Sequence, residues 1–190
     1  MENHIKNFSE EIKNKIDKVS SDEIAKAVKC LQSVYENNGR VYLIGNGGSS
    51  AIASHFANDL NKTILGHKGE KKIKRFQAIS LCDNVPVITA WANDVSFDKI
   101  FSEQLKNFAK QGDVLIAISS SGNSPNIIEA VKTAKDFSLP VVGFMGFDGG
   151  KLLELSDAKI YVSSSEYAIV ESIHDAICHL IISYFEKNLI

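Results

Sequence analysis

Short apolar runs that alternate with helical stretches constrain the fold of this 190-residue sequence more than any other feature. Most of these runs end in a turn rich in Gly, Ser or Asn, after which a helical stretch begins. Continuous apolar strands joined by helices are typical of a parallel sheet that is buried on both faces. We therefore predict an α/β fold with a doubly wound, five-stranded parallel sheet in the flavodoxin-like order 2-1-3-4-5. The predicted strands are 41–45, 76–80, 114–118, the run PVVGFMG that begins at residue 140, and 158–164.

Before the first strand and after the last one, apolar residues recur at the spacing typical of helices. Residues 1–38 contain no Gly or Pro and are predicted to form amino-terminal helices, with a cap between them at Ser20–Glu23. We predict one domain over 1–190, with this helical segment at 1–38 and the α/β core at 39–190. Further helices are expected over 85–92, 97–109 and 127–134, and a long last helix from Glu166, whose buried face is marked by Ile173, Ile177, Leu180 and Ile181.

Composition limits the classes of partner. The formal net charge of −2 leaves no basic footprint, so we expect no nucleic-acid partner. The three cysteines are scattered, which argues against a disulfide framework. No apolar stretch approaches the ~20 residues of a membrane span, and the polar start MENHIKNFSEEIKNK does not resemble a signal peptide. These observations predict a cytoplasmic protein with no membrane partner.

Two polar loops follow the strands at 41–45 and 114–118. In the predicted order these strands flank the point where strand order reverses, and ligands of open α/β sheets bind there. The first loop, GNGGSS, provides glycines and a helix start. The second, SSSGNS, provides four serines, and Pro125 after them suits the first turn of the following helix. Hydroxyls and helix-terminal amides favour a phosphate monoester on a small polar ligand. A dinucleotide is disfavoured, because the first loop lacks the G-x-G-x-x-G spacing typical of dinucleotide-binding sites. The alternative for either loop taken alone is a plain polar turn.

A group of ionisable residues lies on the two helices nearest this position. His55 and Asp59 are four apart and share a helix face, beginning just after the glycine-rich loop. On the last helix, Glu171, Asp175 and His179 are spaced i, i+4, i+8, and His174 lies between them. Such groups can hold a divalent metal or act in acid–base chemistry, and the alternative is a set of surface pairs or structural histidines.

The two loops on this β/α series resemble the sugar isomerase (SIS) domain, whose serine-rich loop binds the phosphate of a phosphosugar. Within that domain the sequence resembles the phosphoheptose isomerase (sedoheptulose 7-phosphate isomerase) family over almost its whole length. The resemblance rests on IGNGGSSAIASHFANDL, WANDVSFDKIFSEQL, GDVLIAISSSGNSPNIIEAV, GFDGGKL and VESIHDAICH.

The resemblance implies a metal site, usually for zinc, formed by His55, Asp59, Glu171 and His179. Asp59 stands where the family usually has Glu, and Glu171 where it usually has Gln. Asp is one methylene shorter, so its carboxylate can miss a position that Glu reaches. Glu171 adds an anion that could strengthen the metal site or act as the base itself.

The resemblance also implies an activity. This is the isomerisation of sedoheptulose 7-phosphate to D-glycero-D-manno-heptose 7-phosphate, for activated heptose in lipopolysaccharide or capsule. Asp59 or Glu171 would be the base and His179 its partner. The implied substrate-binding residues are Asn46, Gly47, Gly48, Asn93 and Asp94 for the sugar and Ser119, Ser120, Ser121 and Ser124 for the phosphate.

Two alternatives remain open on the sequence. One is a non-catalytic SIS protein that binds a phosphosugar or a protein partner, and the other is an isomerase of a different phosphosugar. Apolar stripes on the amino-terminal helices and the last helix, together with the resemblance, predict a homo-oligomer, most simply a tetramer.

Overall fold

The computed structural model of the chain describes residues 1–66 and 69–189 and contains one parallel sheet. Its strand order is β2-β1-β3-β4-β5, which confirms the predicted α/β fold and its flavodoxin-like topology. Neighbouring strands pair in parallel throughout, and Gly45 lies opposite Ile118 at the carboxyl ends of the two central strands. The strands are β1 (Val41–Gly45), β2 (Ala78–Ser80), β3 (Val114–Ser119), β4 (Val141–Met145) and β5 (Ala158–Tyr161).

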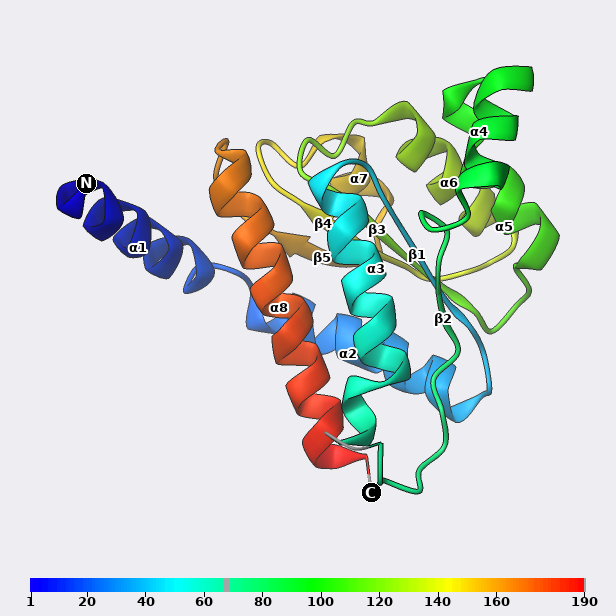
Figure 1. Ribbon diagram of the computed structural model, residues 1–190, viewed down its shortest axis with the longest axis horizontal. Helices are drawn as coiled ribbons and strands as arrows, with labels where there is room; N and C mark the ends of the chain where they lie inside the picture. The colour runs from blue at the N-terminus through cyan, green and yellow to red at the C-terminus, as the bar shows by residue number, and fades with distance from the viewer. Residues whose placement is uncertain (67–68, 190) are drawn as a thin grey trace.

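Helices cover both faces of this sheet (Figure 1). They are α1 (Glu2–Ile16), α2 (Ser21–Glu36), α3 (Gly48–Asn61), α4 (Val85–Asp94), α5 (Ser102–Phe108), α6 (Pro125–Asp136), α7 (Gly150–Leu155) and α8 (Tyr167–Asn188). Two short 3₁₀ helices, η1 (Thr63–Leu65) and η2 (Phe97–Lys99), complete the described elements. The cap expected before α2 is present, because Ser20 Oγ accepts a hydrogen bond from the Glu23 amide at 3.3 Å.

Alternate residues of each strand point to opposite faces, so the sheet separates two apolar cores. Val41 and Leu43 of β1 belong to the core beneath α2, α3 and α8. Tyr42 and Ile44 belong to the other core, beneath α5, α6 and α7. Every residue of β1, β3 and β4 is buried, as expected for central parallel strands covered on both sides.

Three local predictions were wrong in detail. The single helix expected over 97–109 is split into η2 and α5, and Ile100 and Phe101 at the break are both buried in the core. The second strand begins at Ala78 instead of 76. On α8, Ile173, Ile177 and Ile181 are buried as expected, but Leu180 is 49% exposed.

The last helix is more apolar than the sequence analysis allowed. Helix α8 has 22 residues and a mean hydropathy of 1.3 over its most apolar window, which by length and composition alone would allow a membrane span. Half of that window is buried inside the fold. Helix α8 lies beside α3 (Figure 1) and contributes Ile169, Ile173 and Ile177 to the core beneath the sheet. It therefore packs as a core helix of the α/β fold.

Candidate functional site

The serine loop between β3 and α6 is held in a compact shape by its own backbone and by the loop after β4. Gly122 has a φ of +64°, and a Cβ there would lie 2.0 Å from the carbonyl oxygen of Gly149. The Gly146 amide donates to the carbonyl of Ser120 at 2.8 Å, which ties the loop to the end of β4. Only glycine fits at 122, because both the backbone angle and the neighbouring chain exclude a side chain.

The hydroxyls of this loop are poorly satisfied within the protein. Ser119 and Ser124 lie 3.3 Å apart through their Oγ atoms, and Ser121 Oγ accepts a weak hydrogen bond from the Asn123 amide. Ser120 Oγ is buried and has no hydrogen-bond partner among the residues that the structure describes. Helix α6 begins directly after the loop, with Pro125 in its first turn as expected. Unpaired hydroxyls at a helix start suit an anionic oxygen.

A reciprocal pair of side-chain amides joins the serine loop to the glycine-rich loop after β1. Asn46 Nδ2 donates to Asn126 Oδ1 at 2.9 Å, and Asn126 Nδ2 donates back to Asn46 Oδ1 at 2.8 Å. Asn126 is buried, with 1% of its surface exposed. The pair fixes the two loops relative to each other across the switch point of the sheet.

The two loops and the start of α8 enclose a pocket of about 310 Å³, which we call the serine pocket. Glu171 of α8 lies against Gly48, where a Cβ would come within 2.5 Å of the carboxylate. Glu171 thus occupies the space that a side chain at position 48 would fill. The pocket is lined by Asn46, Gly47, Gly48, Ser49, Ile118, Ser119, Ser120, Ser121, Ser124, Tyr167 and Glu171.

A second pocket of about 320 Å³ adjoins the serine pocket, because Gly48 and Glu171 line both. Its other lining residues come from the facing sides of α3 and α8 and include His55 and Asp175. The two pockets therefore meet at Gly48 and Glu171.

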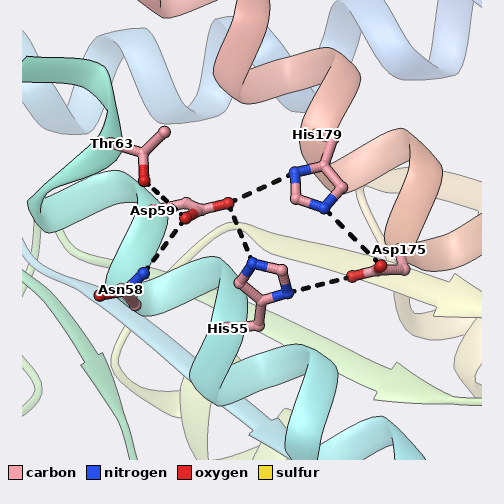
Figure 2. A network of polar contacts seen from close by, with 6 residues as sticks. All are labelled: His55, Asn58, Asp59, Thr63, Asp175 and His179. Carbon is pink, nitrogen blue, oxygen red and sulfur yellow. Dashed lines mark hydrogen bonds and ion pairs between the residues drawn. The ribbon is translucent and has the colours of Figure 1, made fainter. Parts of the chain in front are cut away.

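Four side chains between α3 and α8 form a closed ring of contacts, which we call the His–Asp cluster (Figure 2). Asp59 Oδ2 lies 3.5 Å from His55 Nε2 and 3.4 Å from His179 Nδ1. On the opposite side of the rings, the Asp175 carboxylate lies 3.5 Å from His55 Nδ1 and 3.7 Å from His179 Nε2. The imidazoles are nearly perpendicular, with centroids 4.9 Å apart. Each ring therefore has one nitrogen toward each carboxylate.

The two carboxylates of the cluster have different surroundings. Asp59 is buried, and its Oδ1 accepts hydrogen bonds from Thr63 Oγ1 at 2.7 Å and from Asn58 Nδ2 at 3.2 Å. Its side chain is 7% exposed, against 39% for Asp175. No hydrogen bond to the Asp175 carboxylate is found among the described residues outside this ring.

The donor set of the cluster fits a divalent cation. His55, Asp175 and His179 each offer one ligand atom, and these three atoms lie within 4.8 Å of one another. Among the described residues, no other group of three such side chains meets this criterion. Imidazole nitrogen and carboxylate oxygen are ligands that zinc accepts.

The structure brings together most of the residues predicted from the sequence. His55, Asp59 and His179 meet in the cluster, whereas Glu171 lies outside its contacts and lines both pockets. Asn93 and Asp94 are exposed at the end of α4, where Asn93 Nδ2 donates to Asp94 Oδ1 at 2.8 Å, and they line neither pocket. The other seven predicted substrate-binding residues line the serine pocket; they are Asn46, Gly47, Gly48, Ser119, Ser120, Ser121 and Ser124.

Sequence analysis did not assign roles to three residues that the structure places at the site. Asp175 closes the His–Asp cluster, Asn126 joins the two loops, and Tyr167 lines the serine pocket. The i, i+4 spacing of Glu171, Asp175 and His179 carried a signal for Asp175, because it puts all three on one face of α8. Asn126 lies within the quoted serine-loop motif, but its partner is 80 residues away.

Two further titratable groups near the site are locked in their neutral forms by burial. His174 is fully buried, with Nε2 3.2 Å from the Met145 carbonyl, and burial lowers its pKa to about 4. Burial raises the pKa of the Cys82 thiol to about 11. These two residues are therefore structural, and the ionisable chemistry of the site rests on the His–Asp cluster and Glu171.

Comparison with known proteins shows the family to which the chain belongs. A family model described as SIS domain matches residues 6–146. Phosphoheptose isomerase of Leptospira biflexa serovar Patoc is 40% identical over 166 residues, which cover 87% of this chain and 84% of that protein. The structure of a phosphoheptose isomerase from Francisella tularensis matches with a TM-score of 0.89 at 31% identity, covering 98% of this chain and 96% of the other. That of Neisseria gonorrhoeae phosphoheptose isomerase matches with a TM-score of 0.87 at 30% identity, covering 98% of each chain. The chain therefore belongs to the phosphoheptose isomerase family of SIS-domain proteins.

Proposed function

We propose that this phosphosugar isomerase interconverts sedoheptulose 7-phosphate and D-glycero-D-manno-heptose 7-phosphate, as a step toward activated heptose for lipopolysaccharide or capsule. Family membership supports the reaction class, and the names of the relatives support the seven-carbon substrate. We expect the enzyme to act in the cytoplasm, where sugar phosphates are made and used.

One observation carries the proposal: Glu171 lines the same pocket as the serine loop. An aldose–ketose isomerase must hold the phosphate at one end of the sugar and move a proton between C1 and C2 at the other. The volume of about 310 Å³ is at the lower end of the range for small-ligand pockets, as suits a single sugar phosphate. The serine loop between β3 and α6 would bind the phosphate, and Glu171 of α8 would move the proton.

The geometry favours Glu171 over Asp59 as the base. The Glu171 carboxylate faces the glycine-rich loop inside the pocket, whereas Asp59 is buried behind the two imidazoles and lines neither pocket. We propose that Glu171 removes the C1 proton of the ketose while O2 gains a proton, which gives the cis-enediol. Glu171 then returns its proton at C2 while the O1 proton leaves, so that the hydroxyl proton passes from O1 to O2 directly or through one water. A general base of this kind must lie within hydrogen-bond reach of the carbon that loses its proton, directly or through one water.

We further propose that the His–Asp cluster holds a divalent cation, zinc being the first candidate. When bound there, the cation supplies a positive charge that polarises the sugar carbonyl. His179, which the resemblance implied as the acid–base partner, then serves the cluster, because it lines neither pocket.

The test is solvent exchange during turnover. The purified chain is incubated with sedoheptulose 7-phosphate in D₂O, and carbon-bound deuterium is followed by NMR, with a small panel of other ketose phosphates alongside. We expect an aldose product that carries deuterium at C2. Preferred turnover of another ketose phosphate would reassign the substrate. Binding with neither exchange nor turnover would indicate a non-catalytic phosphosugar-binding protein.

We also propose that the chain forms a homo-oligomer, most simply a tetramer. No residue of α1 is buried, Ile5 is 57% exposed, and the helix extends away from the rest of the chain (Figure 1). An apolar groove of about 310 Å³ between α2 and α8 is lined in part by Ile24, Val28, Leu180 and Tyr184. Light scattering at micromolar concentration tests this, and the mass of a single chain would contradict it.

A further inference from the structure

We infer that Tyr167 contacts the bound sugar and sets the chain length that the serine pocket prefers, and that Phe147 is a positioning residue that holds the Tyr167 ring at the pocket. This role deepens the proposed function and rests on it, because it assumes that a sugar phosphate occupies the serine pocket. Tyr167 is the first residue of α8, and Phe147 lies in the loop after β4.

Tyr167 stands at the open side of the serine pocket. It lines the pocket together with Glu171, and it is 59% exposed whereas Glu171 is half-buried. The two residues are four apart, so they share one face of α8 and lie about 6 Å apart along its axis. Among the described residues, none forms a hydrogen bond with the Tyr167 hydroxyl. Tyrosine therefore offers an apolar ring face and a hydroxyl, the two kinds of contact that a sugar chain can accept.

Phe147 has a backbone conformation that phenylalanine rarely adopts. Its φ is +53°, in the left-handed region that favours glycine. The other described non-glycine residues with positive φ are Asn38 and Ser138, which follow the ends of α2 and α6, where this conformation commonly terminates a helix. Phe147 follows a strand and terminates no helix. A bulky side chain kept at such a backbone position points to a function for its ring.

Hydrogen bonds on both sides hold Phe147 in this conformation. Its amide donates to the Ser164 carbonyl at 2.8 Å, and its carbonyl accepts from the Tyr161 hydroxyl at 2.7 Å. The preceding amide, that of Gly146, donates to the Ser120 carbonyl at 2.8 Å. Phe147 is thus fixed both to the serine loop, through its neighbour, and to the chain that enters α8, through its own amide.

The Phe147 ring packs against the ring of Tyr167. The ring centroids are 4.9 Å apart, and the planes are tilted by 58°. This separation is typical of favourable aromatic pairs. Phe147 therefore restricts the positions of an otherwise exposed ring, although it does not itself line the serine pocket.

The places of these groups around the pocket predict a preference for longer sugars. In the proposed function the serine loop holds the phosphate and Glu171 faces the reacting carbons, so both ends of a ketose phosphate are fixed. Carbons added between the ends must bow toward the open side of the pocket, where Tyr167 stands. A seven-carbon chain then packs on the ring and brings a hydroxyl to that of the tyrosine, whereas a five-carbon chain joins the two ends without reaching it.

Binding of unreactive ligands to the full chain tests this role without turnover. The probes are the alcohol phosphates obtained by borohydride reduction of sedoheptulose 7-phosphate and of ribulose 5-phosphate, together with inorganic phosphate, and calorimetry gives each Kd. We expect the wild type to bind the seven-carbon probe more tightly than the five-carbon probe. Tyr167→Ala should weaken binding of the seven-carbon probe about 10–100-fold and change the other two by less than about 2-fold. Tyr167→Phe, which removes only the hydroxyl, should weaken it about 2–10-fold.

Two substitutions of Phe147 separate a positioning role from a merely structural one. Phe147→Gly removes the ring but suits the left-handed backbone, so the loop should keep its shape. This variant should weaken binding of the seven-carbon probe about 2–10-fold and leave that of phosphate unchanged. Phe147→Tyr keeps a ring and should keep the wild-type Kd. The control is Phe97→Ala, which removes an exposed ring outside both pockets and should change no Kd.

Equal Kd values for the two sugar probes in the wild type would overturn the role of Tyr167, as would an equal loss for all three ligands in Tyr167→Ala. Unchanged binding of the seven-carbon probe in Phe147→Gly would overturn the role of Phe147. None of these readouts depends on isomerase activity. A chain that fails the D₂O assay but keeps this preference would refute the proposed reaction and leave the Tyr167 contact standing, whereas failure to bind any of the three probes would overturn both.

Discussion

The serine pocket and the His–Asp cluster are neighbours, yet the fold builds them in different ways. The pocket is made mostly by two loops at the ends of adjacent strands, whose shape is set by backbone bonds and by glycines such as Gly122. The cluster is made by side chains alone, from two helices whose contributing residues are more than a hundred positions apart. The difference shows that a strand order places loops reliably, whereas a cluster depends on the rotation of each helix about its axis.

The two regions should also differ in what they contribute to catalysis. In the proposed function, the loops bind the part of the sugar that does not react, and that binding would be equal in the ground state and the transition state. Glu171, at the boundary of the two pockets, would act only where bonds change. Variants in the two regions should therefore separate into effects on KM and effects on kcat.

The largest effect should come from Glu171→Gln. The amide keeps the size of the side chain but cannot accept a proton, so we expect kcat to fall about 10²–10⁴-fold with little change in KM. Steady-state kinetics measure this, and Glu166→Gln, just before the start of α8 and outside both pockets, is the matched control. If Glu171→Gln keeps its kcat, the base lies elsewhere, and the proposed separation of kcat effects at Glu171 from KM effects in the loops is wrong.

The next largest effect should come from the serine loop. Ser119→Ala combined with Ser121→Ala removes two hydroxyls that face the pocket, and each charge-assisted hydrogen bond is worth about 1.5–3 kcal/mol. We expect KM to rise about 10–100-fold for each lost bond while kcat changes little. Ser165→Ala, in the loop before α8, serves as the control. An unchanged KM in a folded double variant would remove the serine loop from phosphate binding.

The smallest effect concerns stability and separates His174 from the cluster on the same helix. Burial lowers the pKa of His174 from 6.5 to about 4, so the unfolded chain takes up a proton that the folded chain refuses. The contribution of neutral His174 to the free energy of unfolding is therefore fully present above pH 6.5 and is lost as the pH drops toward 4. The loss between pH 7.5 and pH 5 should be about 2 kcal/mol.

Urea unfolding of the wild type and of His174→Gln at the two pH values measures this difference. The glutamine can still donate to the Met145 carbonyl, which also accepts from the Val162 amide. The variant should lose less stability on acidification by about that amount. An equal loss in both proteins would assign the acid sensitivity to other groups, the cluster among them.

Much of the fold followed from the sequence, because period and turn chemistry are local. Strand order, the cap at Ser20 and the place of Pro125 in the first turn of α6 were all predicted correctly. The break at Ile100 was missed because the helical spacing of apolar residues continues across it, through Phe97, Ile100 and Leu105. Leu180 was assigned to the core by spacing alone, but the structure leaves it 49% exposed beside the groove between α2 and α8.

The residues of the site show the same contrast between local sequence signals and tertiary packing. The loop residues were found because they follow strand ends, and the structure places them around one pocket. The composition of the cluster was not fully predicted, since Glu171 and Asp175 are one turn apart on the same helix face and spacing cannot rank them. The packing of α8 against α3 decides it, by turning Asp175 toward the imidazoles and Glu171 toward Gly48.

The reciprocal amide pair between Asn46 and Asn126 has a consequence for anyone who redesigns this enzyme. Each amide completes its hydrogen bonding through the other, so changing one alone strands a polar group in a largely buried place. A mutant library that varies either position singly will be dominated by destabilised clones, whatever their activity. Substituting Asn46 and Asn126 together, with side chains that still complement each other, would change how the glycine-rich loop packs against the serine loop. Such paired changes are the way to alter which sugars the pocket admits.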